Sequence, residues 1–284
     1  MAVHDRKRDL LLRVSLGSII PALILLAWWY GIKVGTAVVP TFGEVVDVLR
    51  HPFRPPDIYS GSLAFSFYMT ILRLSVGFGL AVVTAVPLGV LAGRFRTVRY
   101  LINPAVQMSR PINPIVLLPI ATVLFGITSV ASVLYGALDA WRHDVFDQVQ
   151  IAMILILWWG GFFPILLSTI HGVYSVRKTY IETMQILGAD WWQTFRHVYL
   201  PYTLPHIING MRIAMGVTWL VLIAAEIFPG TRSGLGYMLC TACKTSDYQY
   251  TFAALIVIGV TGFILDSGLH LMEKKTGHWL SSVR

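Results

Sequence analysis

Charged residues are scarce in this sequence of 284 residues. Asp, Glu, Lys and Arg together make up 13% of it, whereas a typical soluble domain has about 25%. Cysteine is almost absent, since Cys240 and Cys243 are the only two, so a scaffold held by several disulfides is excluded. The pattern G-x-x-x-x-G-K-[ST] does not occur, so the chain has no P-loop with which to bind ATP. The HExxH and GxSxG patterns of two enzyme classes are missing as well.

Hydrophobic residues, in contrast, make up 56% of the chain, and its mean hydropathy is +0.67. They come in long blocks, and about 20 apolar residues in helical form suffice to cross a bilayer. We therefore predict an all-α, polytopic membrane protein with six transmembrane helices. The predicted spans are residues 16–33, 63–93, 101–125, 149–171, 206–228 and 251–272.

The six spans form a single transmembrane domain, residues 16–272, between a basic N-terminal tail (1–15) and a second tail (273–284). A cleaved signal peptide is the alternative for the first span, because basic residues precede its apolar run. No A-x-A site follows that run, so an uncleaved span is favoured. The third span is broken by prolines, which a membrane tolerates where the helix faces protein or a cavity. These prolines are Pro104, Pro111, Pro114 and Pro119.

Lysine and arginine are distributed unevenly between the two faces of this topology. Fifteen of the 22 are counted on one face: those in the tails, four assigned to the segment between spans two and three, Arg110 among them, and four in or beside the loop between spans four and five, Arg212 among them. Since cytoplasmic loops carry the excess of positive charge, both termini are predicted to be cytoplasmic. The net charge of +8 is then a result of topology and does not indicate a nucleic-acid partner. The opposite face holds Lys33, Arg50, Arg54, Arg142, Arg232 and Lys244, and Arg73 lies within a span.

The loop between the fourth and fifth spans, residues 173–205, has two helix-start signals. Thr179 and Glu182 have the spacing of a capping box, and so do Asp190 and Gln193. Gly188 suits the stop between the two helices. The loop is thus predicted to be a helix, a glycine turn and a second short helix.

The second short helix carries an apolar surface. Trp191, Trp192, Phe195 and Val198 contribute to it. Pro201 is expected to end this helix, because proline lacks the N–H that an interior helix position donates. An apolar surface outside the bilayer indicates a partner; the alternative is an ordinary amphipathic loop.

This loop resembles the EAA loop of ABC importer permeases. That motif reads Glu-Ala-Ala, three residues, Gly, nine residues, Ile, any residue, Leu-Pro; Thr183, Met184 and Val198 depart from it here. In the family, the loop docks into a cleft of a cytoplasmic ATPase. The resemblance therefore implies an ATPase-coupling role for Glu182, Gly188, Ala189, Asp190, Trp191, Trp192, Phe195, Arg196, Leu200 and Pro201.

Other segments resemble the same family. Residues 72–78 resemble the start of its second span, and Arg-Pro-Ile-Asn-Pro at 110–114 resembles its proline-rich third span. Ala-Ala-Glu at 224–226 and Gly-Leu-Gly-Tyr at 234–237 resemble the nitrate, sulfonate and taurine group, which also contains bicarbonate and vitamin-precursor carriers. One departure is an insertion near residues 128–146, which either contacts a partner or forms a surface hairpin or short interfacial helix.

The resemblance implies the membrane subunit of an ATP-driven importer in the bacterial inner membrane, moving a small oxyanion. Its expected partners are the lipid bilayer, a second copy of the chain, two ATPases that bind ATP and Mg, and an extracytoplasmic solute-binding protein. No cofactor, metal site or catalytic residue is expected in the chain itself. A stand-alone secondary transporter and an intramembrane enzyme are the alternatives. The solute, and whether the permease pairs with itself or with a different permease, stay open.

Ionisable residues within spans are costly, and are usually paired or face a cavity. Arg73 and Glu226 are therefore either a structural pair or residues of a solute pathway. The candidates for a pathway or gate are Arg73, Pro111, Asn113 and Glu226. A structural pair is predicted for Asp266 and His270, one helical turn apart. Whether Cys240 and Cys243 form a disulfide stays open.

Overall fold

The computed structural model describes residues 19, 23, 26–33, 39–55, 61–125, 128–135, 147–228 and 231–281. Apart from one bridge between Ser129 and Gln150, the regular structure of these residues is helical, which confirms the predicted all-α class. The N-terminal tail lies outside the described residues, as do residues 16–18, 20–22, 24 and 25 of the first predicted span. The shorter described helices are α2 (Phe42–Arg50), α6 (Val130–Tyr135), α9 (Lys178–Ile186), α10 (Trp191–Thr194) and α12 (Leu235–Lys244).

Four helices of the described part are long and apolar enough to cross a membrane. They are α3 (Leu63–Arg94), α8 (Ile151–Tyr174), α11 (Leu200–Ile227), which continues from α10, and α13 (Tyr248–Ser281). The number rises to five if a bent pair of helices counts as one span. An all-α, polytopic membrane protein is the class that these helices define, while six spans and cytoplasmic termini stay predictions.

The bent pair occupies the predicted third span. Helix α4 (Arg96–Ser109) is followed by the short 3-10 helix η1 (Pro114–Val116) and by α5 (Leu117–Phe125), and the two halves meet at 76°. The bend falls at residues 110–113. Pro111 and Pro114 withhold two backbone donors there, so a straight helix would lose hydrogen bonds and gain ring clashes. Pro104, in contrast, lies inside α4.

The core of the bundle is formed where α3 and α11 pack on opposite sides of α8. Small residues permit the close approach, as is usual between membrane helices. A Cβ atom at Gly77 would lie 2.5 Å from the Cβ of Leu157, and one at Gly89 would lie 2.7 Å from that of Thr169. These two glycines therefore allow α3 and α8 to pack closely.

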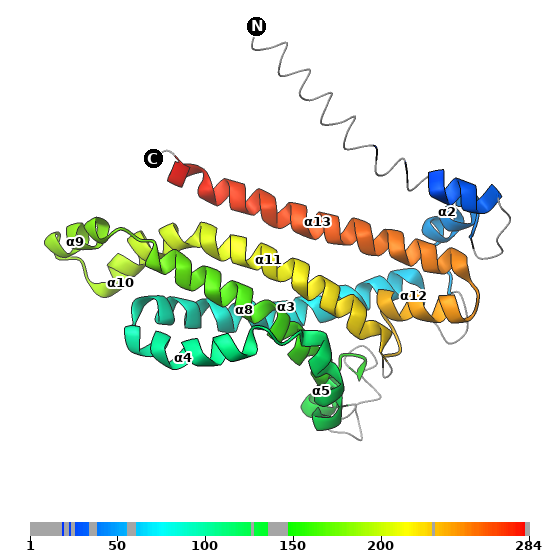
Figure 1. Cartoon of the computed structure of the whole chain (residues 1–284), viewed down its shortest axis with the longest axis horizontal. Coiled ribbons are helices and arrows are strands. Elements are labelled where there is room, and N and C mark those ends of the chain that lie inside the picture. Colours follow the sequence, from blue (N-terminus) through cyan, green and yellow to red (C-terminus); the bar gives the residue numbers. More distant parts are fainter. Residues whose placement is uncertain are drawn as a thin grey trace, which may run out of the picture.

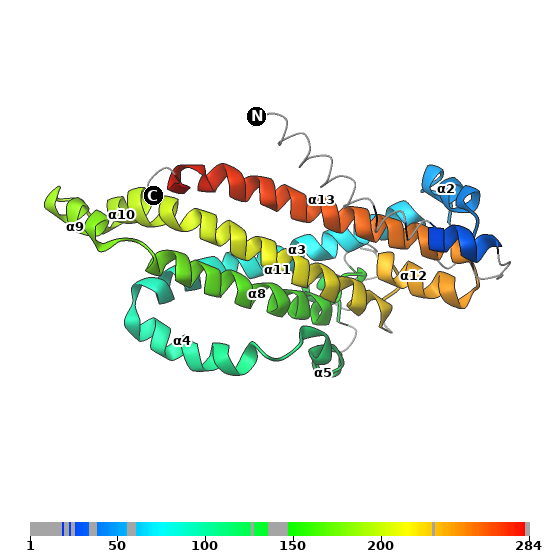
Figure 2. The ribbon, with the colours of Figure 1, turned by 45° about the horizontal axis from the view of Figure 1, so that its top comes forward.

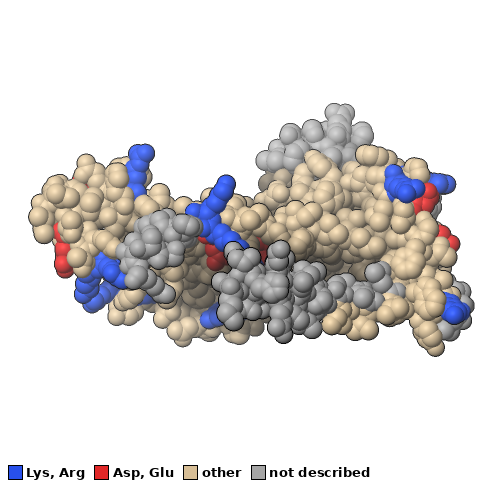
Figure 3. Space-filling model, turned by 90° about the horizontal axis from the view of Figure 1, so that it is seen from above, with Lys and Arg blue, Asp and Glu red and all other residues tan. Residues whose placement is uncertain are grey.

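The long helices lie roughly side by side along one axis of the molecule (Figure 1; Figure 2). Helices α9 and α10 lie at one end of that axis, and α2 and α12 lie at the other (Figure 1). The surface seen in Figure 3 is mostly uncharged, with Lys and Arg in a few separate groups. The loop that resembles a coupling element and the buried charges described below are therefore at opposite ends of the bundle.

Candidate functional site

The first helix of the loop, α9, begins two residues earlier than the predicted capping box implies. Its N-cap is Arg177, which makes no side-chain cap, so the predicted capping box at Thr179 and Glu182 is wrong. Its end is as predicted: Gly188 has φ +68°, a conformation that glycine adopts without steric cost. The Gly188 N–H donates to the Gln185 carbonyl and the Ala189 N–H to the Met184 carbonyl, both at 3.0 Å. This pair of bonds is a Schellman motif, which gives the turn a defined shape.

The second helix, α10, starts as predicted. Asp190 is its N-cap, and a capping box with Gln193 is present. The prediction that Pro201 ends the helix is wrong, because α10 continues through the π-helical segment η3 (Phe195–Tyr199) into α11. Pro201 is near the start of α11, where the widened π turn accommodates a residue without an N–H. The loop is therefore joined to α11 by continuous helix.

The end of the loop exposes large apolar side chains. Trp191 and Trp192 are 47% and 58% exposed, and their rings stack on Phe195 with centroids 5.5 and 5.6 Å away. Ile186 and Leu187, which the sequence interpretation missed, are 86% and 74% exposed. We call Ile186, Leu187, Trp191 and Trp192 the aromatic tip. Glu182, Arg196 and Leu200 are exposed nearby in the chain.

The base of the loop, in contrast, is anchored to the bundle. Tyr199 is buried with Val173 and Val176 in a small apolar cluster of its own. Phe195 and Val198 pack against that cluster, so the predicted apolar surface is divided between the base and the tip. A fixed base under an exposed apolar tip is the arrangement expected of a docking element.

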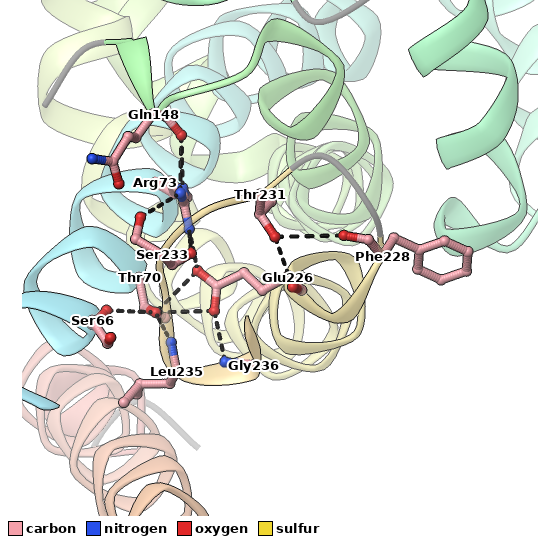
Figure 4. A network of polar contacts seen from close by, with 10 residues as sticks. All are labelled: Ser66, Thr70, Arg73, Gln148, Glu226, Phe228, Thr231, Ser233, Leu235 and Gly236. Carbon is pink, nitrogen blue, oxygen red and sulfur yellow. Dashed lines mark hydrogen bonds and ion pairs between the residues drawn. The ribbon is translucent and has the colours of Figure 1, made fainter. Parts of the chain in front are cut away.

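Arg73 and Glu226, the second candidate site, form a buried ion pair. The Arg73 Nη1 lies 2.7 Å from the Glu226 Oε1, and neither side chain has any exposed surface. The guanidinium makes five hydrogen bonds, as many as it has N–H groups. Besides Glu226, the acceptors are the Ser233 carbonyl and hydroxyl and, twice, the Gln148 carbonyl (Figure 4).

The Glu226 carboxylate is equally well surrounded. Its Oε2 accepts the Gly236 N–H at 3.0 Å, and the Thr70 hydroxyl lies 3.0 Å from both carboxylate oxygens. Thr70 also accepts the Leu235 N–H at 2.9 Å. The pair therefore joins the end of α11 to α3 and to the start of α12 (Figure 4).

Two glycines allow the chain to wrap around this carboxylate. Gly234 has φ +120°, and a Cβ there would collide with the carboxylate of Glu226. A Cβ at Gly236 would collide with the Ile223 carbonyl. The Ala-Ala-Glu and Gly-Leu-Gly segments, which look independent in the sequence, are thus two halves of one structural unit.

The four pathway candidates do not form one site. Arg73 and Glu226 come together as the structural pair that was one of two predicted alternatives, and their burial leaves no surface for a solute. Pro111 and Asn113 lie in the break between α4 and η1, where the Asn113 side chain accepts the Ile115 N–H at 3.1 Å. A groove of about 340 Å³ lies beside that break. Its walls are Arg110, Ile112, Pro114, Trp159, Gly160, Phe163, Pro164, Leu167, Ser168, Ile213 and Val217.

Three further sequence predictions have an outcome. Asp266 and His270 do share a cluster, but each contacts Arg212 of α11, at 2.8 and 3.0 Å. Cys240 and Cys243 are free thiols on α12. Of the insertion near 128–146, the described part contains α6, as expected of a short helix, and residues 136–146 lie outside the description.

These features define a class: a polytopic helical membrane protein with a capped helix–turn–helix loop between two long helices. The chain belongs to the family described as binding-protein-dependent transport system inner membrane components, whose model matches residues 85–278. It is thus a transport subunit of the ABC importer type and not an enzyme.

Similar proteins cover nearly the whole chain. A Methanocaldococcus jannaschii protein provisionally named an ABC transporter permease is 33% identical over 281 residues, 98% of this chain and 96% of the relative. The taurine transport system permease of Escherichia coli is 28% identical, covering 95% and 91%. The bicarbonate transport permease of Synechococcus elongatus is 28% identical, covering 78% and 72%. A solved bacterial alginate ABC transporter shares the fold, with a TM-score of 0.58, 16% identity and 96% of each chain covered.

Proposed function

We propose that this protein forms, as a pair of copies, the channel of an importer in the bacterial inner membrane. An extracytoplasmic binding protein delivers a small oxyanion, and two cytoplasmic ATPases, which hold the ATP and Mg, dock on the loop of residues 173–205. The names of the taurine and bicarbonate relatives support the oxyanion. The aromatic tip, exposed on a capped turn at the end of the molecule, is the observation that carries the docking proposal.

A continuous helix connects the loop mechanically to the far end of the bundle. The continuous helix Trp191–Ile227 has 37 residues, about 55 Å at 1.5 Å per residue. It connects the aromatic tip at one end to Glu226 at the other. Because Glu226 is bonded to α3 and α12, a displacement of the tip by the ATPase moves α11 together with these two helices. Closure of two ATPases would therefore reorient the whole bundle.

Copurification tests the docking. We expect a Trp191→Ala/Trp192→Ala double variant of the permease to lose most of the ATPase that copurifies with the wild type, since apolar anchors at the centre of an interface carry much of its affinity. Trp29→Ala is the matched control, because Trp29 is also about half exposed (51%) but lies far from the loop in the sequence. Equal ATPase recovery with the wild type and the double variant would refute docking at the aromatic tip.

A further inference from the structure

The only two cysteines of the chain lie one turn apart on α12. Cys240 and Cys243 have i, i+3 spacing on this helix, so their side chains are neighbours on one of its faces. Cys243 is exposed, and Cys240 is half-buried. Helix α12 lies at the end of the bundle opposite α9 and α10 (Figure 1). In the predicted topology that end is extracytoplasmic, where thiols meet oxidants that cytoplasmic thiols do not.

A cysteine pair with this spacing serves either a metal or redox chemistry. The described part of the chain contains no group of three or more His, Cys, Asp and Glu side chains that could hold a metal ion. The unequal exposure of the two thiols suits redox chemistry instead. An accessible thiol reacts first with an oxidant, and a neighbouring thiol then resolves the product.

The helix brings the two cysteines almost within disulfide distance. A helix radius of 2.3 Å and a rise of 1.5 Å per residue give a Cα–Cα distance of about 5 Å for residues i and i+3, and disulfides span about 4.4–6.8 Å. The Cβ atoms are about 5–6 Å apart, whereas a disulfide requires about 3.5–4.5 Å. The bond therefore forms only if one of the two residues leaves the helical conformation. A disulfide formed with such strain is readily reduced, as regulatory disulfides are.

Cys243 is the residue that can leave the helix at small cost. Only Lys244 follows it in α12, so opening the helix there disturbs its last turn and spares the rest. The Thr245 N–H, which donates to the Thr241 carbonyl at 3.0 Å, closes that turn. Cys240 lies deeper in the helix, where a change of conformation would break more bonds.

The elbow between α12 and α13 depends on the same turn. The Asp247 N–H donates to the Ala242 carbonyl at 2.9 Å. Ser246, just before it, has φ +66°, the one positive φ of a non-glycine residue in the described part. Surrounding contacts must hold a residue in this conformation. Opening the last turn of α12 removes such a contact, so α12 and α13 are then no longer held at one angle.

The first turn of α12, in contrast, is bonded to the buried ion pair. The Gly236 N–H donates to Glu226 at 3.0 Å, and the Leu235 N–H donates to the Thr70 hydroxyl at 2.9 Å (Figure 4). Helix α12 thus connects the ion pair to α13. The cysteines lie in the part of α12 that can open while these two bonds remain.

We propose that Cys240 and Cys243 are a redox-active dithiol, which an extracytoplasmic protein disulfide oxidises to a disulfide that opens the elbow between α12 and α13. The Cys243 thiolate attacks one sulfur of the oxidant and expels the other as a thiolate. The Cys240 thiolate then attacks the Cys243 Sγ and expels the second sulfur of the oxidant. The permease loses two electrons and two protons, and the oxidant takes up both and leaves as a dithiol. This inference requires the predicted topology but neither the solute nor the ATPase of the proposed function.

Oxidised glutathione tests the chemistry on the purified permease. Free thiols are then blocked with a maleimide, and the intact mass is measured. We expect the wild type to lose two hydrogens and to carry neither glutathione nor maleimide, because Cys240 resolves the mixed disulfide formed at Cys243. Excess reduced glutathione should restore both thiols.

Two variants isolate the role of the spacing. Cys240→Ser should stop at the mixed disulfide and keep one glutathione. Cys240→Ser/Thr241→Cys is the matched control, because it keeps two cysteines but places them about 200° apart around the helix. It should also keep glutathione and form no internal disulfide.

Hydrogen exchange of the oxidised and reduced wild type measures the effect on the elbow. Residues 241–250 should exchange roughly tenfold faster or more when oxidised, because the last turn of α12 opens, while α8 should exchange equally in both forms.

Several results would overturn the inference. They are a wild type that keeps glutathione or takes up two maleimides, an internal disulfide in the matched control, and equal exchange of residues 241–250 in the two forms. A covalent dimer on a non-reducing gel would assign the disulfide to two copies of the chain and would overturn it too. Reaction of Cys243 with an impermeant reagent only from the cytoplasm would remove the extracytoplasmic oxidant.

Discussion

Replacing Glu226 by glutamine tests whether the buried ion pair holds together the end of the bundle that carries α12. The change leaves the Arg73 guanidinium with its bonds to Ser233 and Gln148 but without a counter-charge, in a place with no exposed side-chain surface. Removing one partner of a buried pair costs about 3–5 kcal/mol. We expect Arg73→Gln to cost a similar amount, because it strands the carboxylate instead.

The double variant, Arg73→Gln/Glu226→Gln, separates the charge effect from lost packing. It removes both charges, so its loss of unfolding free energy should be smaller than the sum of the two single losses, by up to about 3 kcal/mol. Two glutamines also retain donors and acceptors for Thr70, Ser233 and the Gly236 N–H.

Thermal unfolding of the purified permease in one detergent measures these differences. A loss of 1 kcal/mol lowers the Tm of a chain of this size by roughly 2–4 °C, so each single variant should unfold on the order of 10 °C below the wild type. Arg96→Gln removes an exposed arginine and should leave the Tm unchanged. The reasoning fails if the single variants unfold at the wild-type Tm, or if the double variant loses as much as both singles combined.

Three further predictions concern the loop, the backbone turn at Gly234 and the topology. Gly188→Val should abolish solute-stimulated ATP hydrolysis by the complex, because a branched residue resists φ +68°, whereas Gly188→Asn should retain it. Equal rates of stimulated hydrolysis by the two variants would show that the turn has no part in coupling. Gly234→Ala should reduce the yield of folded permease, since its Cβ collides with Glu226, and a normal yield would contradict that contact. In a background without the native cysteines, Asp190→Cys should react with an impermeant thiol reagent only from the cytoplasm. A second variant, in which the exposed Cys243 is kept as the single cysteine, should react only from outside. Reaction of both from one face would overturn the predicted topology.

Local features of this protein were predictable where the physics is local. A run of apolar residues specifies a membrane helix by its length, and the Asp190 capping box and the turn at Gly188 depend on residues within a few positions. Prediction failed where two local rules competed. Pro201 has no N–H to donate, yet the helix continues, because the preceding π turn and the packing of Tyr199 against Val173 and Val176 stabilise it.

Depth in the bundle required the structure. Arg110 follows a basic turn in the sequence, and charge counting assigned it to the cytoplasm. Its distance from the turn at Arg94 depends on α4 running back along the bundle before the bend of 76°. The prolines nearby favour a bend but do not set its direction. The groove exists only because α8 and α11 meet that bend.

The sequence by itself determined the class of the protein, its long helices and the short helix after the turn at Gly188, because hydrophobic length, caps and motif spacing act over short stretches of chain. Only the tertiary structure decided which charges meet. Arg73 and Glu226 are 153 residues apart, and nothing in either neighbourhood selects the other. The packing of α3, α8 and α11 brings them together. Close helix contacts bury both charges, and each then neutralises the other.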